Sequence, residues 1–183
     1  MRLLPILAAC ALLGADPAAE RMQAKLDRLD QHGYHPGDTV IFTSQEINSW
    51  ARVEVPKAVP EGVRDERVEL GAGTATAYAL VDFLKMRQSK GKSTNFLIAK
   101  FIEGERPLKV SVRFASGGGL CTVYLTRVEI GGVSAEGSVL DFLVKNFFMP
   151  LYPDAKINEP FELGDNIDRL DVRPDGARVI LKR

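Results

Sequence analysis

The stretch of sequence that decides the fold begins at Phe42 and ends at Phe83. It comprises a helix start, a link broken by prolines and two strands, which read FTSQEINSW (42–50), ARVEVPKAVPEG (51–62), RVEL (67–70) and GTATAYALVDF (73–83). Within it the spacing of apolar residues changes from that of a helix to the period of two that is typical of a strand. The stretch therefore predicts helices packed beside an antiparallel sheet.

The helix start carries a complete capping signal. Thr43 is the expected N-cap, and Glu46 follows three residues later, as in a capping box. Phe42 and Ile47 have the spacing of a hydrophobic staple. We expect Pro56 to end this helix, because proline lacks a backbone donor and clashes with the preceding turn.

The second strand has small side chains along one face. Residues of one parity point to the same side of a sheet, so we expect these side chains to face inward. They belong to Gly73, Ala75, Ala77, Ala79, Val81 and Phe83. Small inward residues leave room for either a helix or an apolar ligand.

Helices are also predicted near both ends of the chain. Asp16 is a suitable cap for a helix that has Pro17 at its first position. Ser138 is a suitable cap for a third helix, with Asp141 completing a pattern like a capping box. Segment 139–149 would form a helix that is apolar around almost its whole circumference, which predicts that this helix is buried on most sides.

The remaining apolar patterns predict strands. Segment 108–114 alternates cleanly, whereas 120–130 changes parity, which predicts a bulge near Thr126 and Arg127. Two C-terminal strands, around 170–172 and 179–181, are joined by the turn sequence PDG. Together these elements predict an α+β fold: an antiparallel sheet of about five or six strands with helices on one face, the apolar helix lying in its concavity.

Length and charge limit the possible classes of protein. A chain of 183 residues is expected to form one domain. Lys plus Arg equals Asp plus Glu, at 24 each, which argues against nucleic-acid binding.

The first residues resemble an export signal. A basic start, the apolar run 3–13 and the small residues Gly14 and Ala15 predict a signal peptide over 1–15, a single mature domain over 16–183 and a location in the cell envelope. The sequence LAAC, which ends at Cys10, also resembles a lipobox and would make the protein a lipoprotein. The alternative is that this run forms a first core helix.

The sequence offers few groups for chemistry. His32 and His35 lie in one turn beside Asp38, and their spacing fits no common metal site. No pattern of nucleophile and base is present, so we expect neither an enzyme nor a bound cofactor. Cys121 lies in a strand pattern and is expected to be a small buried hydrophobe.

One cluster of charge is purely basic. It consists of Lys85, Arg87, Lys90 and Lys92, and an apolar segment, 96–102, follows it. Such an arrangement fits contact with an anionic membrane surface. The alternative is a solvated loop followed by an amphipathic core element, which is the more usual origin of such a cluster.

Several segments resemble a known family. They are FTSQEINSW (42–50), ALVDFL (79–84), RPLKVSV (106–112), VEIGGV (128–133) and PFEL (160–163). With them the chain resembles small exported bacterial proteins of the tubular lipid-binding (TULIP-like) type. The resemblance implies a strongly curved antiparallel sheet wrapped around a long buried helix, with lipid chains or other apolar ligands between them. It implies no catalytic residues.

These observations lead to two functional hypotheses. The first is a non-catalytic cell-envelope protein that binds lipid or another apolar ligand between sheet and helix. The expected ligand-lining residues are Trp50, Ala75, Ala77, Ala79, Val81, Phe83, Leu143 and Phe147. The second is a structural or scaffolding module in which the protein's own side chains fill the groove, and which acts through a protein partner.

Overall fold

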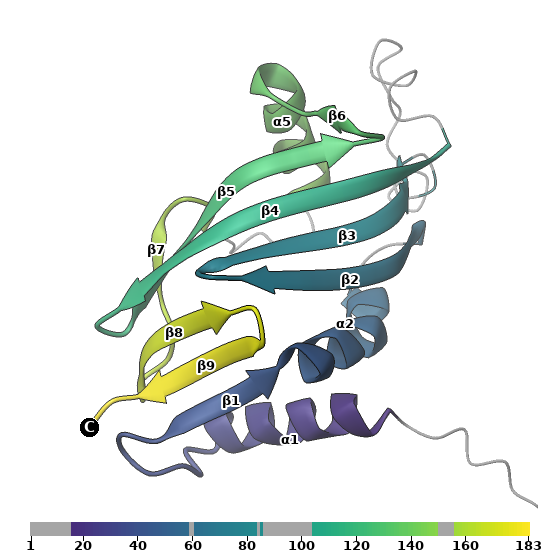
Figure 1. Ribbon diagram of the computed structural model, residues 1–183. Helices are drawn as coiled ribbons and strands as arrows, with labels where there is room; N and C mark the ends of the chain where they lie inside the picture. Colours follow the sequence, from purple (N-terminus) through teal and green to yellow (C-terminus); the bar gives the residue numbers. More distant parts are fainter. Residues whose placement is uncertain (1–15, 59–60, 84, 86–103, 150–155) are drawn as a thin grey trace, which may run out of the picture.

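The computed structural model describes residues 16–58, 61–83, 85, 104–149 and 156–183, with only the backbone described at Ala58, Phe142, Asn146 and Phe147. This part of the chain contains a large antiparallel sheet of six strands, a smaller sheet of three strands and several helices (Figure 1). The predicted α+β class and the predicted antiparallel sheet of about five or six strands are confirmed.

The elements follow one another in a simple order. The helical segments are α1 (Pro17–Asp30), α2 (Ser44–Ala58), α5 (Gly137–Leu143) and the π-helical turn η1 (Val144–Phe148). The strands are β1 (Thr39–Thr43), β2 (Val63–Gly71), β3 (Thr74–Asp82), β4 (Glu105–Gly117), β5 (Leu120–Ile130), β6 (Val133–Ser134), β7 (Pro160–Glu162), β8 (Ile167–Arg173) and β9 (Gly176–Leu181).

The strands divide between the two sheets in a way that the sequence did not indicate. The larger sheet has the order β2-β3-β4-β5-β6, and β7 also pairs with β5. The C-terminal hairpin β8–β9, expected in that sheet, instead pairs with β1 in the order β1-β9-β8. Backbone hydrogen bonds join the sheets, because Gly73 N–H donates to Val172 O at 2.9 Å and Gly119 N–H donates to Asp168 O at 2.6 Å.

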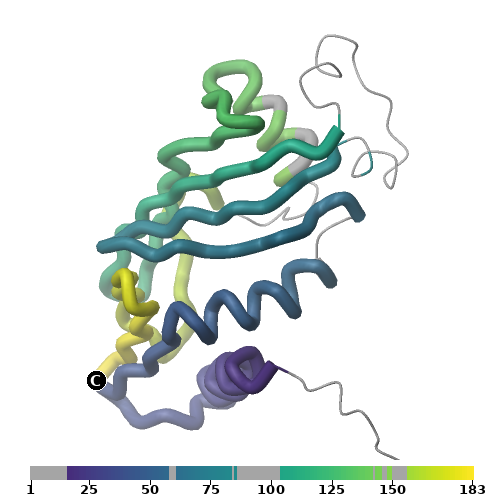
Figure 2. Tube along the Cα trace, turned by 45° about the vertical axis from the view of Figure 1, so that its right-hand side comes forward, coloured from purple at the N-terminus to yellow at the C-terminus, as the bar shows by residue number. Residues whose placement is uncertain are grey.

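Each sheet has its own apolar core. The core of the smaller sheet joins Val40, Phe42, Val179 and Leu181 to Leu29 of α1. The core of the larger sheet joins Val81, Phe83, Val128 and Ile130 to Ala135 and to Leu143 of α5. Figure 2 shows α2 beside β2 at the edge of the larger sheet, with α1 beyond α2. The N-terminal helices therefore lie at one edge of the larger sheet, and α5 packs at the other end of the molecule.

The local signals at the starts of α1 and α2 are confirmed. Asp16 Oδ1 accepts from Ala18 N–H at 2.9 Å, and Pro17 is the first residue of α1. Thr43 N–H donates to Glu46 Oε2 at 2.9 Å, and Glu46 N–H donates to Thr43 Oγ1 at 3.2 Å, so the capping box closes in both directions.

Two predicted helix boundaries are wrong. α2 runs through Pro56 and ends at Ala58, so the hydrogen bond that proline cannot donate is lost only in the last turn. α5 begins at Gly137, one residue before the expected cap Ser138, and no side chain caps it. Gly137 has a φ of 53°, so a glycine backbone makes the turn into this helix.

Candidate apolar ligand site

A cavity of about 280 Å³ lies between one face of the larger sheet and the segment α5–η1. All of the lining residues that belong to the described part of the chain are apolar. They are Val63, Val81, Phe83, Leu108, Val110, Val112, Val123, Leu125, Val128, Leu140, Leu143, Val144, Phe148 and Ile157. Ligand pockets usually have volumes of about 300–1,000 Å³ and mostly apolar walls, so this cavity has the usual kind of wall and a volume just below that range.

Strand register brings the wall of the cavity together. Val110 lies opposite Val128, and Val112 lies opposite Leu125, so Thr126 is the extra residue between the two pairs. The bulge predicted near Thr126 is therefore confirmed. In a regular strand, residues an odd number of positions apart point to opposite faces of the sheet. Without the bulge, Leu125 and Val128, three residues apart, would therefore point to opposite faces. The bulge places both on the cavity side.

Three of the eight predicted ligand-lining residues line this cavity: Val81, Phe83 and Leu143. Ala79 packs against the adjoining core cluster.

The other four predicted residues do not belong to the lining that the structure describes. Ala75 and Ala77 lie opposite Val112 and Val110, on the same sheet face, and Ala77 is exposed. Trp50 belongs to α2 and points toward α1, where its indole Nε1–H donates to Gln23 Oε1 at 2.8 Å. Phe147 lies in η1, and its side chain is outside the described part.

Sequence reasoning missed most of the wall. The alternating apolar residues of segments 108–114 and 120–130 correctly indicated strands. Nothing in that pattern indicated that residues of β4 and β5 would line a cavity. Ile157 could not have been found in this way. It reaches the cavity because it forms an isolated parallel bridge with Val123 of β5.

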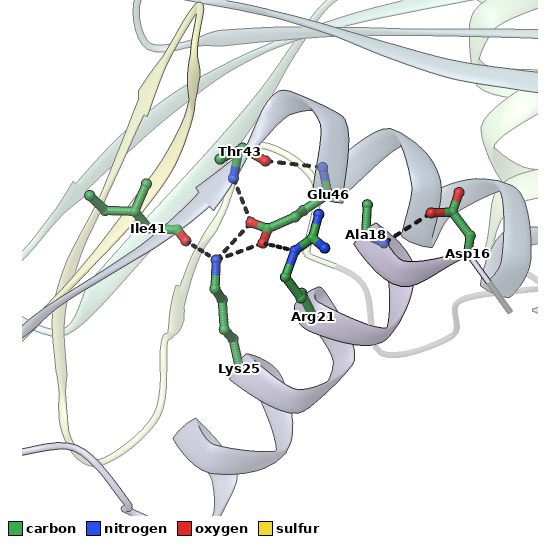
Figure 3. A network of polar contacts seen from close by, with 7 residues as sticks. All are labelled: Asp16, Ala18, Arg21, Lys25, Ile41, Thr43 and Glu46. Carbon is green, nitrogen blue, oxygen red and sulfur yellow. Dashed lines mark hydrogen bonds and ion pairs between the residues drawn. The ribbon is translucent and has the colours of Figure 1, made fainter.

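A polar cluster around Glu46 joins the N-terminal elements (Figure 3). Lys25 Nζ lies 2.8 Å and 2.7 Å from the two carboxylate oxygens of Glu46, and it also donates to Ile41 O at 2.7 Å. Burial by itself would raise the pKa of Glu46, but hydrogen bonds from Lys25 and Thr43 outweigh it and hold the pKa below the ordinary value. Every partner stabilises the charged form, so this cluster fixes α1 against β1 and α2.

The other candidate groups for chemistry are separate from one another. In the described part of the chain no group of three His, Cys, Asp or Glu side chains could hold a metal ion. His35 is highly exposed and lies 3.6 Å from Asp38. Cys121 is 1% exposed, which confirms it as a buried residue, and burial raises the pKa of its thiol.

Only one residue of the basic cluster can be placed. Lys85 is exposed and lies 3.8 Å from Asp82 Oδ2. Arg87, Lys90 and Lys92 lie outside the described residues, as does the expected signal peptide with Cys10. None of the described helices is long and apolar enough to cross a membrane.

Comparisons with family models, curated proteins and solved structures found no match. The resemblance to tubular lipid-binding proteins therefore remains a prediction from the sequence.

Proposed function

We propose that this protein is a non-catalytic cell-envelope protein that binds a lipid or another apolar ligand in the cavity between the larger sheet and α5–η1. The observation that supports this proposal best is the lining itself, since the fourteen described residues that line about 280 Å³ are all apolar. An apolar cavity excludes water and favours apolar ligands.

The face beside the cavity supports the same proposal. Ala77 is exposed although its neighbours across the sheet, Val68 and Val110, carry larger apolar side chains. This part of the face offers apolar surface along which a bound chain would continue beyond the cavity. In this proposal the sheet curves around α5–η1 as it does in tubular lipid-binding proteins.

The location in the cell envelope rests on the sequence pattern of residues 1–15. Its test is the intact mass of the protein from its native host, together with fractionation of that host. A mass that begins near Asp16, or one that includes lipid on Cys10, would support export. An unmodified Met1 start in the cytosol would exclude it.

Ligand binding is tested by calorimetric titration with 1-decanol and by native mass spectrometry of gently purified protein. Val110→Phe fills the cavity from the middle of β4, and we expect it to weaken decanol binding at least tenfold. Ala115→Phe is the matched control, because Ala115 is an exposed residue of the same strand and does not line the cavity. Absence of decanol binding to the ligand-free wild type, with no co-purified ligand, would favour the scaffolding hypothesis instead.

A further inference from the structure

Arg106 is a charged residue beside the apolar wall of the cavity. It lies directly opposite Val81 in the pairing of β3 with β4. Residues directly opposite each other in an antiparallel pair share a face of the sheet. Val81 is 1% exposed and lines the cavity. Leu108, two residues from Arg106 along β4, also lines the cavity. Arg106 therefore adds a cation to the end of this apolar face.

One nitrogen of the Arg106 guanidinium has no hydrogen-bond partner. This nitrogen, Nε, is buried. A Cβ placed on Gly131 would lie 3.7 Å from Arg106 Cδ, so the side chain runs toward the turn between β5 and β6. A buried donor without a partner is unfavourable and rare in folded proteins, and a ligand group is one way to satisfy it.

We propose that the cavity takes a single-chain amphiphile with an anionic head and that Arg106 binds the head. This inference rests on the proposed function. The nitrogens Nε and Nη of an arginine form a fork that matches the two oxygens of a carboxylate, and rotation of the side chain turns Nε toward such a head. The tail lies along Val81 and Leu108.

The cavity volume limits the length of the tail. A volume of about 280 Å³ corresponds to roughly nine water molecules at about 30 Å³ each. A chain of about ten carbons fills a comparable space, whereas a lipid with two long chains exceeds it. Decanoate is therefore the appropriate probe, and 1-decanol is a neutral probe with the same chain.

Glu66 of β2 is the competing partner for Arg106. Its Oε1 is the other buried side-chain atom without a hydrogen bond in the described part of the chain. β2 and β4 lie on either side of β3, so the two residues belong to strands about 10 Å apart. If these side chains paired with each other, Arg106 would not need an anionic ligand.

The experiment is calorimetric titration of the ligand-free protein with decanoate and with 1-decanol. We expect the wild type to bind decanoate at least tenfold more tightly than decanol. Arg106→Gln should remove this preference and leave decanol binding within about twofold. Arg106→Lys should retain part of the preference, because it keeps the charge without the fork. Glu66→Gln should bind decanoate at least as tightly as the wild type.

The two proposals fail in different ways. Decanol binding with no preference for decanoate in the wild type would overturn the role of Arg106 and leave the apolar site in place. Equal losses of decanoate binding in Glu66→Gln and Arg106→Gln would also overturn it, because they would indicate an internal ion pair. Binding of neither probe would overturn the proposed function itself. If Arg106→Gln does not fold, an unchanged preference in Arg106→Lys overturns the forked contact.

Discussion

The side chain of Asn48 on α2 forms with Val68 of β2 the two hydrogen bonds that a neighbouring strand would form. Val68 N–H donates to Asn48 Oδ1 at 2.7 Å, and Asn48 Nδ2 donates to Val68 O at 2.8 Å. The same Nδ2 also donates to Ser44 O, one turn earlier in α2. An unpaired edge strand invites pairing with other chains, so this amide covers the β2 edge of the larger sheet at its middle.

We expect Asn48→Ala to destabilise the protein by about 1–3 kcal/mol. The substitution leaves Val68 N–H and Val68 O without partners beside a packed helix, and an unmade hydrogen bond of this kind costs about that much. Asn48→Asp should cost a similar amount, because a carboxylate accepts from Val68 N–H but cannot donate to Val68 O. Urea unfolding measures both losses.

The control for Asn48 is Gln45→Ala on the same helix. Gln45 is exposed, so its truncation should change stability by less than about 0.5 kcal/mol. A loss for Asn48→Ala no larger than that of Gln45→Ala would show that the helix does not hold the sheet edge through this amide.

Thr43→Ala should destabilise the protein by about 1 kcal/mol, the usual contribution of an N-cap side chain. The reason is that Glu46 N–H loses its acceptor, Thr43 Oγ1. Thr43→Ser keeps a hydroxyl oxygen in the same place and should be nearly silent. Thermal or urea melts of the two variants measure the difference, and equal losses would contradict a capping role.

Glu46 should make stability depend on pH in the acid range. Its pKa is lowered in the folded protein from an ordinary value of 4.5, because the hydrogen bonds from Lys25 and Thr43 outweigh the opposing effect of burial. A carboxylate with a depressed folded pKa contributes its full stabilisation above the unfolded pKa and loses it as pH falls through the folded pKa. The stability difference between wild type and Glu46→Gln should therefore be constant above about pH 5 and shrink below 4.5.

Urea midpoints measured between pH 7 and pH 3 give this difference. Lys25→Met is the companion variant, since it removes the cation that lies 2.7 Å from Glu46. The double variant should lose less than the sum of the two single losses, because both remove the same contact. A difference that grows as the pH falls would refute the assigned direction of the pKa shift.

Signals carried by a few adjacent residues predicted the structure well. The capping box at Thr43, the cap at Asp16 and the bulge at Thr126 each depend on spacing within one element, so the sequence shows them directly. The partition of strands between two sheets depends on pairing between distant segments. The pair Thr39↔Ile180 joins strands that are more than 130 residues apart in the sequence, and no local pattern specifies that pair.

The residues of the candidate site also divide into those that a local pattern predicts and those that depend on contacts between distant elements. Val81 and Phe83 were found because alternation places them on one face, and Leu143 because its helix is apolar almost all round. Trp50 was misplaced because an apolar stripe on a helix does not say which neighbour it meets, and here that neighbour is α1. Asn48 and Arg106 gave no signal, since each acts through its position relative to another strand.

Ala77 and Val81 provide the last prediction, because they lie on the same face of β3 and differ in what covers them. Ala77 is exposed, whereas Val81 is 1% exposed and packs in the core. Ala77→Phe should change stability by less than about 0.5 kcal/mol, since nothing must move to make room for the ring. Val81→Phe overpacks the core and should cost about 1–3 kcal/mol. Urea unfolding of ligand-free protein measures both changes.

The same pair separates the two functional hypotheses. If a ligand extends over the alanines, Ala77→Phe keeps its stability and carries less co-purified lipid than the wild type. If the groove is filled by the protein itself, as the scaffolding hypothesis requires, Ala77→Phe is strained and loses about as much stability as Val81→Phe. Two results together would contradict a ligand on this face: strong destabilisation by Ala77→Phe, and a wild-type protein that carries no lipid.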